Sequence, residues 1–183
     1  MAPGCTGGLI LAYRPIRWYA YTWKAMKRWQ SKVMLHYQID GIDQLAQYSA
    51  GDDCEIRWII LPDDFHSVYQ FFREKNPDKP FDEKEMLKSY QACHENGEIY
   101  CALFSNDRIL AMAAVEKYSE RKWETGCVRV SRFERNKGYA KQICYFVTKY
   151  TLDNGRISTC CTEDDNIPMQ KVIQALGFTR CET

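Results

Sequence analysis

The stretch Val130-Ser131-Arg132-Phe133-Glu134-Arg135-Asn136-Lys137-Gly138-Tyr139-Ala140 decides the fold of this chain. Apolar residues before Ser131 predict the end of a β-strand, and helical spacing after Gly138 predicts the start of an α-helix. The first amides of a helix lack partners within the helix, and its dipole favours a bound anion there. Glycine at position 138 leaves the backbone open to a phosphate. The stretch therefore predicts a pyrophosphate-binding loop.

Basic side chains surround this loop at Arg132, Arg135, Lys137 and Lys141. Neither G-x-x-x-x-G-K-[ST] nor G-x-G-x-x-G, the two common nucleotide-binding motifs, is present. The pattern R-x-x-G-x-[GA] alone arises by chance in roughly one chain of this length in ten, and a basic loop is commonly a solvated turn. Its position between a predicted strand and a predicted helix gives the motif its weight.

Regular elements extend outward from the loop on both sides. Upstream, 98–105, 109–118 and 123–131 predict an antiparallel meander. Before it, 56–61 predicts a strand followed by two helices, the first capped by Asp63 or Asp64 and the second by Asp82.

Downstream, the pattern predicts a helix over 138–152, a strand over 157–162, a helix capped by Asn166, and a short strand from Phe178. The order β-α-α-β-β-β-α-β-α-β predicts an α+β sheet flanked by helices. We place this domain at 54–183 and expect residues 1–53 to form an N-terminal extension.

Two motifs resemble those of the GNAT superfamily of N-acetyltransferases. Arg135 to Ala140 resembles its Q/R-x-x-G-x-G/A acyl-CoA loop, and Asn166 followed by a helix and Leu176-Gly177-Phe178 resembles its second signature. The Gly-Tyr-Ala form resembles the glycine N-acyltransferase-like branch. The resemblance implies a mixed, mostly antiparallel, splayed sheet, with acetyl-CoA or another acyl-CoA as the co-substrate.

The resemblance also implies which residues bind the cofactor. Amides from Asn136 to Lys141 would hold the pyrophosphate, and the strand edge at Val128 to Val130 would pair with the pantetheine arm. Asn166 would contact that arm, cap the last helix, or do both. The predicted cofactor-binding residues are Val128, Val130, Arg135, Asn136, Lys137, Gly138, Tyr139, Ala140, Lys141 and Asn166.

The implied reaction moves an acyl group from acyl-CoA to a primary amine by direct attack in a ternary complex. Glu124 is the first candidate for the base that takes the proton of the amine, and Glu116 is the second. The plain alternative for each is a surface glutamate in a sheet. Ile173 stands where many family members have the tyrosine that protonates the departing thiolate, and isoleucine donates no proton.

The missing acid leaves alternatives open. Tyr139, Tyr145 and Cys161 could each supply a proton, and the chain could also be a non-catalytic CoA-binding or CoA-sensing module. We interpret Cys160 and Cys161 as strand residues that face opposite sides of the sheet. A nucleophilic role for either would need a histidine within reach of the thiol.

Composition narrows the classes of partner. Of 183 residues, 25 are Lys or Arg and 24 are Asp or Glu, a net charge of +1. This balance argues against nucleic acid as a partner, and no apolar run approaches the roughly 20 residues of a membrane helix. Nine cysteines without metal or redox spacing indicate a reducing compartment. We expect a cytoplasmic protein that binds no metal and acts on a small-molecule or peptide amine.

Residues 1–35 carry six basic residues and no acidic one, interleaved with tryptophan and tyrosine. Such a segment could contact nucleic acid or a membrane surface. We favour two plainer alternatives, the first of which is a helix that packs on the domain or on a second subunit of a homodimer. The second is an upstream extension, with Met34 as the true start.

Overall fold

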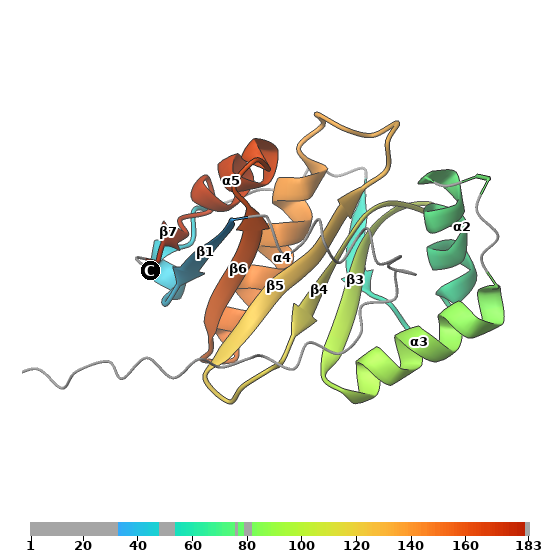
Figure 1. Ribbon diagram of the computed structural model, residues 1–183, viewed down its shortest axis with the longest axis horizontal. Helices are drawn as coiled ribbons and strands as arrows, with labels where there is room; N and C mark the ends of the chain where they lie inside the picture. The colour runs from blue at the N-terminus through green and yellow to red at the C-terminus, as the bar shows by residue number, and fades with distance from the viewer. Residues whose placement is uncertain (1–32, 48–53, 76, 79–81, 182–183) are drawn as a thin grey trace, which may run out of the picture.

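The computed structural model describes residues 33–47, 54–75, 77–78 and 82–181. They form a seven-stranded sheet in the order β2-β3-β4-β5-β6-β1-β7, with helices on both faces (Figure 1). In these ranges no helix is long and apolar enough to cross a membrane. The basic, aromatic segment 1–35, whose role the sequence left open, lies almost entirely outside the described residues.

Strands and helices alternate much as the sequence predicts. The strands are β1 (Met34–Ile39), β2 (Glu55–Trp58), β3 (Glu98–Ser105), β4 (Arg108–Glu116), β5 (Lys122–Val130), β6 (Ile157–Glu163) and β7 (Thr179–Arg180). The helices are the short 3-10 helix η1 (Ile42–Gln44), α2 (Phe65–Lys75), α3 (Glu83–Glu95), α4 (Tyr139–Asp153) and α5 (Ile167–Gln174). Paired strands are antiparallel except β5 and β6, which are parallel. The predicted α+β class with a mostly antiparallel mixed sheet is confirmed.

The sheet begins upstream of the boundary expected at Cys54. β1 lies between β6 and β7 and pairs with both. Leu35, Tyr37 and Ile39 alternate along β1 and are buried, and Leu45 also reaches the core. Because every second residue of a strand faces the same side, this alternation places β1 firmly in the sheet. The domain therefore includes residues that the sequence analysis assigned to an extension.

Capping side chains agree with the sequence in α3 and α5, and the predicted cap of α2 has another partner. Asp82 caps α3, since its carboxylate accepts hydrogen bonds from the amides of Lys84 and Glu85. Asp64 instead binds Arg57 through two hydrogen bonds of 2.6 and 2.9 Å. This ion pair joins β2 to the start of α2.

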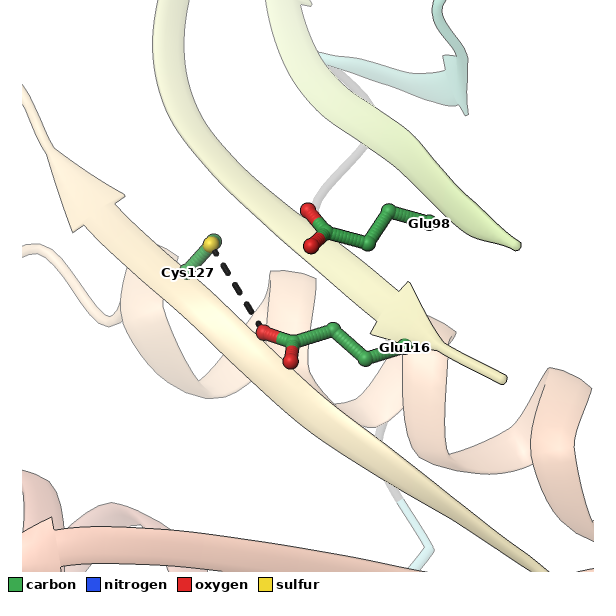
Figure 2. A group of neighbouring side chains, drawn as sticks. All are labelled: Glu98, Glu116 and Cys127. Atoms are coloured by element: carbon green, nitrogen blue, oxygen red, sulfur yellow. Dashed lines mark hydrogen bonds between the residues drawn. The ribbon is translucent and has the colours of Figure 1, made fainter. Parts of the chain in front are cut away.

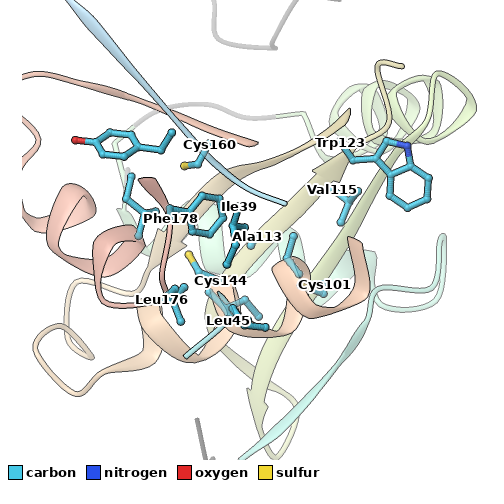
Figure 3. Close-up of a cluster of buried hydrophobic side chains, with 14 of the residues drawn as sticks. Ile39, Leu45, Cys101, Ala113, Val115, Trp123, Cys144, Cys160, Leu176 and Phe178 are labelled. Carbon is cyan, nitrogen blue, oxygen red and sulfur yellow. The ribbon is translucent and has the colours of Figure 1, made fainter. Parts of the chain in front are cut away.

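The two faces of the sheet are covered unequally. α4 packs on one face over the main core, part of which Figure 3 shows, with Ile39 from β1, Ala113 from β4 and Cys144 from α4. On the other face, Phe65 and other side chains of α2 form a smaller cluster with β3 and β4. α2 and α3 contact mainly β3 and β4. The same face of β5, β6 and β1 has little helical cover from the described residues.

Candidate active site

β5 and β6 lie side by side only near their beginnings. Their parallel pairing runs from Lys122 opposite Ile157 to Glu124 opposite Thr159. Beyond this row no pairing between them is found in the described ranges, although β5 continues to Val130. In Figure 1 the two strands diverge from here towards the loop that precedes α4. The divergence opens one edge of β5 to main-chain hydrogen bonds from a ligand.

A β-bulge interrupts β5 inside the opening. The pairing of β4 with β5 shifts between Met112 and Ala114, so β5 carries an extra residue there. Cys127 lies in this bulge with a φ of 53°, and its Sγ lies 3.9 Å from Oε1 of Glu116. Because a bulge re-aims the side chains of its strand, Cys127 reaches the face that carries Glu116 and Glu124.

The loop between β5 and α4 presents backbone amides to this opening. Asn136 and Gly138 have φ angles of 63° and 83°, both in the left-handed region. Left-handed residues within a turn direct successive amides to one side and create an anion-binding concavity. The amide of Lys141 already bonds to the carbonyl of Gly138 at 3.0 Å. Since the first amides of a helix have no acceptor within it, those before Lys141 are positioned to bind an anion.

Gly138 keeps the space in front of these amides clear. A Cβ atom added there would meet no atom within 4 Å, so it would project into open space. The φ of 83° also disfavours any residue with a side chain. Both observations fit a phosphate group that approaches the backbone at this point.

Ion pairs hold the loop against its surroundings. Glu134 binds Lys137 at 2.7 Å and Arg108 at 3.3 Å, and Ser131 donates a hydrogen bond to Glu74 of α2. The hydrogen bond from Lys137 lowers the pKa of Glu134 below its usual value. The ammonium group of Lys137 is therefore directed at Glu134 rather than at a ligand.

The splayed strands, the loop and α5 surround a cleft of about 1040 Å³, comparable to the upper end of known ligand sites. All sequence-predicted cofactor residues except Lys137 line it, namely Val128, Val130, Arg135, Asn136, Gly138, Tyr139, Ala140, Lys141 and Asn166. Asn166 also caps α5, because its Oδ1 accepts a 3.4 Å hydrogen bond from the amide of Met169. The cleft thus joins the two motifs that lie far apart in the sequence.

A second cavity, of about 950 Å³, lies beside α2 and the turn between β3 and β4. It shares Phe71, Glu74, Glu134 and Tyr139 with the cleft, but neither open edge of the splayed strands lines it. The ligand chemistry of the loop therefore belongs to the cleft.

Three glutamates form a row across the sheet. Glu98 of β3 lies opposite Glu116 of β4, and Glu116 lies opposite Glu124 of β5. Directly opposed residues share a face of the sheet, and like charges so placed repel each other. Glu124 lines the cleft where the pairing with β6 ends, whereas Glu116 does not line it. Of the two predicted bases, only Glu124 reaches the cleft.

Figure 2 shows Glu98, Glu116 and the thiol of Cys127 turned towards one another, with their ligand-type atoms within 4.8 Å. Glu98 is 5% exposed and accepts a 2.5 Å hydrogen bond from Tyr100. Burial, with Cys127 and Glu98 nearby, raises the pKa of Tyr100. Carboxylates and thiolates are metal-ligand types. Tyr100 and Cys127 already engage the two carboxylates, however, and we interpret the group as the acidic end of the row.

Two arrangements on this face escaped the sequence analysis. The hydroxyl of Tyr118 lies 2.9 Å from Oγ1 of Thr159, and burial together with Glu124 raises the pKa of Tyr118. His36 of β1 lies against Cys161 of β6, with 3.9 Å between Nε2 and Sγ. Neither pair has a local sequence signal, because each joins residues of strands distant in the chain.

The three candidate proton donors differ in their position relative to the cleft. Tyr139 and Cys161 line the cleft, whereas Tyr145 is not among the residues that surround it. Ile173 is fully buried in the main core. The family tyrosine position is therefore a packing position in this chain.

A model of the acetyltransferase (GNAT) family matches residues 62–178. The chain belongs to this family. The expected resemblance is thereby confirmed, and the GNAT fold supports acyl transfer from CoA in general terms. The glycine N-acyltransferase-like branch stays a prediction. No curated protein sequence matches the chain.

Solved structures show the same GNAT fold. A GNAT-family acetyltransferase from Colwellia psychrerythraea is 24% identical with a TM-score of 0.63, covering 81% of this chain and 52% of that one. An acetyltransferase from Trypanosoma brucei is 17% identical with a TM-score of 0.58, covering 72% and 96%. AAC(6')-Iy, solved with the bisubstrate analogue CoA-S-monomethyl-acetylneamine, is 18% identical with a TM-score of 0.57, covering 71% and 93%.

Several of the matched structures are considerably longer than this chain. The chain spans 52% to 65% of the length of four of them, including the Colwellia protein.

Proposed function

We propose that this GNAT chain transfers an acetyl or other acyl group from acyl-CoA to a primary amine. One observation carries the proposal: a carboxylate, Glu124, lies where the pairing of β5 and β6 ends and the cleft begins. This is the meeting point that an activated acyl group and an incoming amine require. The family assignment supports acyl-CoA as the donor.

The residues of the cleft fit an acyl-CoA molecule, which supplies a thioester carbonyl open to attack by an amine. The amides from Asn136 to Ala140 are assigned to the pyrophosphate, with Arg135 and Lys141 adding positive charge. The open edge of β5 at Val128 to Val130 is assigned to the pantetheine amides. Asn166 borders the cleft from the side of α5.

Glu124 is assigned as the base. An amine attacks only in its neutral form, so its proton must pass to a nearby acceptor, directly or through a water. Glu116 is the second candidate for the base. Amides of the bulged segment at Val128 would polarise the thioester carbonyl.

The departing thiolate needs little help. Ile173 is buried and cannot protonate it, whereas Tyr139 and Cys161 line the cleft and remain alternatives for a proton donor. A free thiol has a pKa of about 8.5, so its thiolate is a good leaving group near neutral pH. The loss of the family tyrosine is therefore compatible with catalysis.

The acceptor proposed here is a cationic amine, either a small molecule or a lysine-like side chain of a peptide. The row of Glu98, Glu116 and Glu124 gives this face of the sheet negative charge next to the cleft. A second ammonium group on the acceptor would relieve the repulsion within the row. Tyr118 and Thr159, joined by their hydrogen bond, border the row on the β6 side.

The test combines calorimetry with turnover. Acetyl-CoA should bind with micromolar or better affinity, and Arg135→Glu should weaken that binding. A panel of amines, each as a monoamine and a diamine of matched length, is then assayed for acetyl-CoA consumption. We expect the diamines to be acetylated more efficiently, with a preference that weakens as salt screens charge. Tight CoA binding without turnover of any amine would instead support a CoA-binding module.

A further inference from the structure

Cys161 and His36 form a thiol–imidazole pair close to the point where β5 and β6 diverge. They are direct partners in the antiparallel pairing of β6 with β1, and Nε2 of His36 lies 3.9 Å from Sγ of Cys161. That separation is within hydrogen-bonding range for sulfur. A thiol with an imidazole in reach is the arrangement that activates a cysteine nucleophile.

The pair lies beside the position proposed for the thioester. Thr159 is the last residue of β6 that pairs with β5, and Cys161 is two residues further along the splayed part. Since residues i and i+2 of a strand share a face, Cys161 follows Thr159 on the face that carries Glu124. Cys161 lines the cleft and is half-buried, while His36 is exposed. The thiol is therefore accessible from the cleft and the imidazole from solvent.

The neighbouring cysteines have a different environment. Cys160, the preceding residue, points to the opposite face and is 3% exposed in the core. Burial raises the pKa of the Cys160 thiol, and burial also raises the pKa of Cys144 to about 12. Thiols of this kind are poor nucleophiles because the thiolate is the reactive form. Cys160 also borders the cleft, but Cys161 differs from both buried cysteines in its greater exposure and in the histidine beside it.

We propose that Cys161 is an S-acylation site, at which the protein takes the acyl group from acyl-CoA when no amine is bound. The inference rests on the proposed binding of acyl-CoA in this cleft. The Sγ–H bond of Cys161 breaks as its proton passes to Nε2 of His36. Sγ then bonds to the acyl carbon while the bond from that carbon to the sulfur of CoA breaks. The CoA sulfur leaves with the electron pair and receives the proton from His36.

The product is a thioester on the enzyme, which differs from the direct transfer to an amine assigned to Glu124. The amine and Cys161 therefore compete for the same acyl group. Other titratable groups on this face of the neighbouring strands include Lys122 and Glu124 on β5, Glu163 on β6, and Cys181 after β7, and the ammonium group of Lys122 donates to Gln38 of β1 at 3.2 Å. Cys181 flanks His36 on its other side, since its amide donates to the carbonyl of His36 at 2.9 Å.

The experiment traps the adduct on the full chain. The protein is incubated with acetyl-CoA without amine, quenched in acid, and measured by intact mass spectrometry and peptide mapping. We expect one acetyl group, at Cys161, removable by neutral hydroxylamine as a thioester is. Its rate of formation should saturate with acetyl-CoA. Cys161→Ala and Cys161→Ser should lose the adduct, whereas the matched control Cys181→Ala should keep it.

A His36 variant distinguishes a base from a structural residue, because only the loss of a base changes the pH dependence of the S-acylation rate. His36→Gln should slow S-acylation at neutral pH by about 10²-fold, the usual scale of general base catalysis. The difference should narrow at alkaline pH, because free thiols ionise without a base near a pH of about 8.5. An acylation rate independent of the His36 substitution at every pH would overturn the pairing.

The inference and the proposed function fail in different ways. If acetyl-CoA binds and amines are acetylated but no thioester forms, or if it forms mainly at another cysteine, the S-acylation site is wrong and the transferase stands. If acetyl-CoA does not bind, both are wrong. The melting temperature and the acetyl-CoA affinity of each variant show whether the adduct was lost through misfolding. If Cys161→Ala is misfolded, Cys161→Ser is used in its place.

Discussion

Glu116 and Glu124 lie directly opposite each other on β4 and β5, yet only Glu124 borders the cleft. Two carboxylates so placed repel, and a bound cation between them removes that repulsion. The arrangement links the charge of the acceptor to the group that would take its proton. It also makes the two glutamates separable by mutation, because only Glu124 lines the cleft.

Glu124→Gln should lower kcat by about 10² to 10⁴-fold, the range of a lost general base, and leave acetyl-CoA affinity unchanged. Glu116→Gln should chiefly raise KM for cationic amines. Steady-state kinetics with a diamine and calorimetry with acetyl-CoA measure both effects. The control is Glu120→Gln, in an exposed turn outside the cleft. Equal kcat losses for the two row variants would contradict the assignment of Glu124.

Gly138→Ala and Gly155→Ala form a matched pair for the phosphate loop. Both glycines have a positive φ, 83° and 68°, and an added Cβ meets no atom within 4 Å at either. Each variant should lose about 1–2 kcal/mol of unfolding free energy from left-handed strain. Only Gly138→Ala should lose affinity for acetyl-CoA, by about tenfold or more, corresponding to about 1.4 kcal/mol. Equal affinities in the two variants would exclude the loop as the pyrophosphate site.

Ile173→Tyr restores the family residue and should not improve catalysis. Ile173 is fully buried in the core, so a tyrosine there overpacks the site and should cost about 1–3 kcal/mol of stability. Chemical denaturation and kcat are the measurements. Ile173→Val, which should cost about 0.5–1.5 kcal/mol, provides the conservative control. A rise of kcat in the tyrosine variant would show that position 173 does reach the thioester.

Asp64→Asn should destabilise the protein at neutral pH and not in acid. The hydrogen bond from Arg57 lowers the pKa of Asp64. A carboxyl with a lowered folded-state pKa stabilises the fold above its unfolded pKa of about 3.9 and loses that contribution as the pH falls through the folded value. Melting curves from pH 7 down to pH 3 should therefore converge for the two proteins. Asp63→Asn, at the exposed neighbouring position, should run parallel to wild type throughout.

The sequence predicted the loop and the meander because their signals are local. A strand end, a glycine and a helical repeat within residues 130–147 define the phosphate loop without reference to the rest of the chain. The turns between the meander strands are equally local. The described structure agrees with each of these, with β5 ending at Val130 and α4 starting at Tyr139.

The features that were missed depend on long-range pairing. Leu35, Tyr37 and Ile39 are apolar residues at alternate positions, as expected for a strand. This short run adjoins a basic, aromatic segment, however, and the predicted start of the domain was therefore placed near Cys54. The pairing of His36 with Cys161 joins residues 125 positions apart. The sequence shows a thiol and an imidazole, and only the insertion of β1 beside β6 brings them together.

The place of β1 in the sheet also has a consequence for biosynthesis. Among the strands of the described residues, β1 is made first, whereas its two neighbours, β6 and β7, are made last. Strands this far apart in the sequence pair slowly, because the chain between them loses conformational entropy before any hydrogen bond between the strands compensates for it. A nascent chain therefore contains β1 before either of its two native partner strands is made, and a strand without its partners is a template for pairing with other chains. Yield in cells should depend on chaperone protection of this early strand until translation is complete.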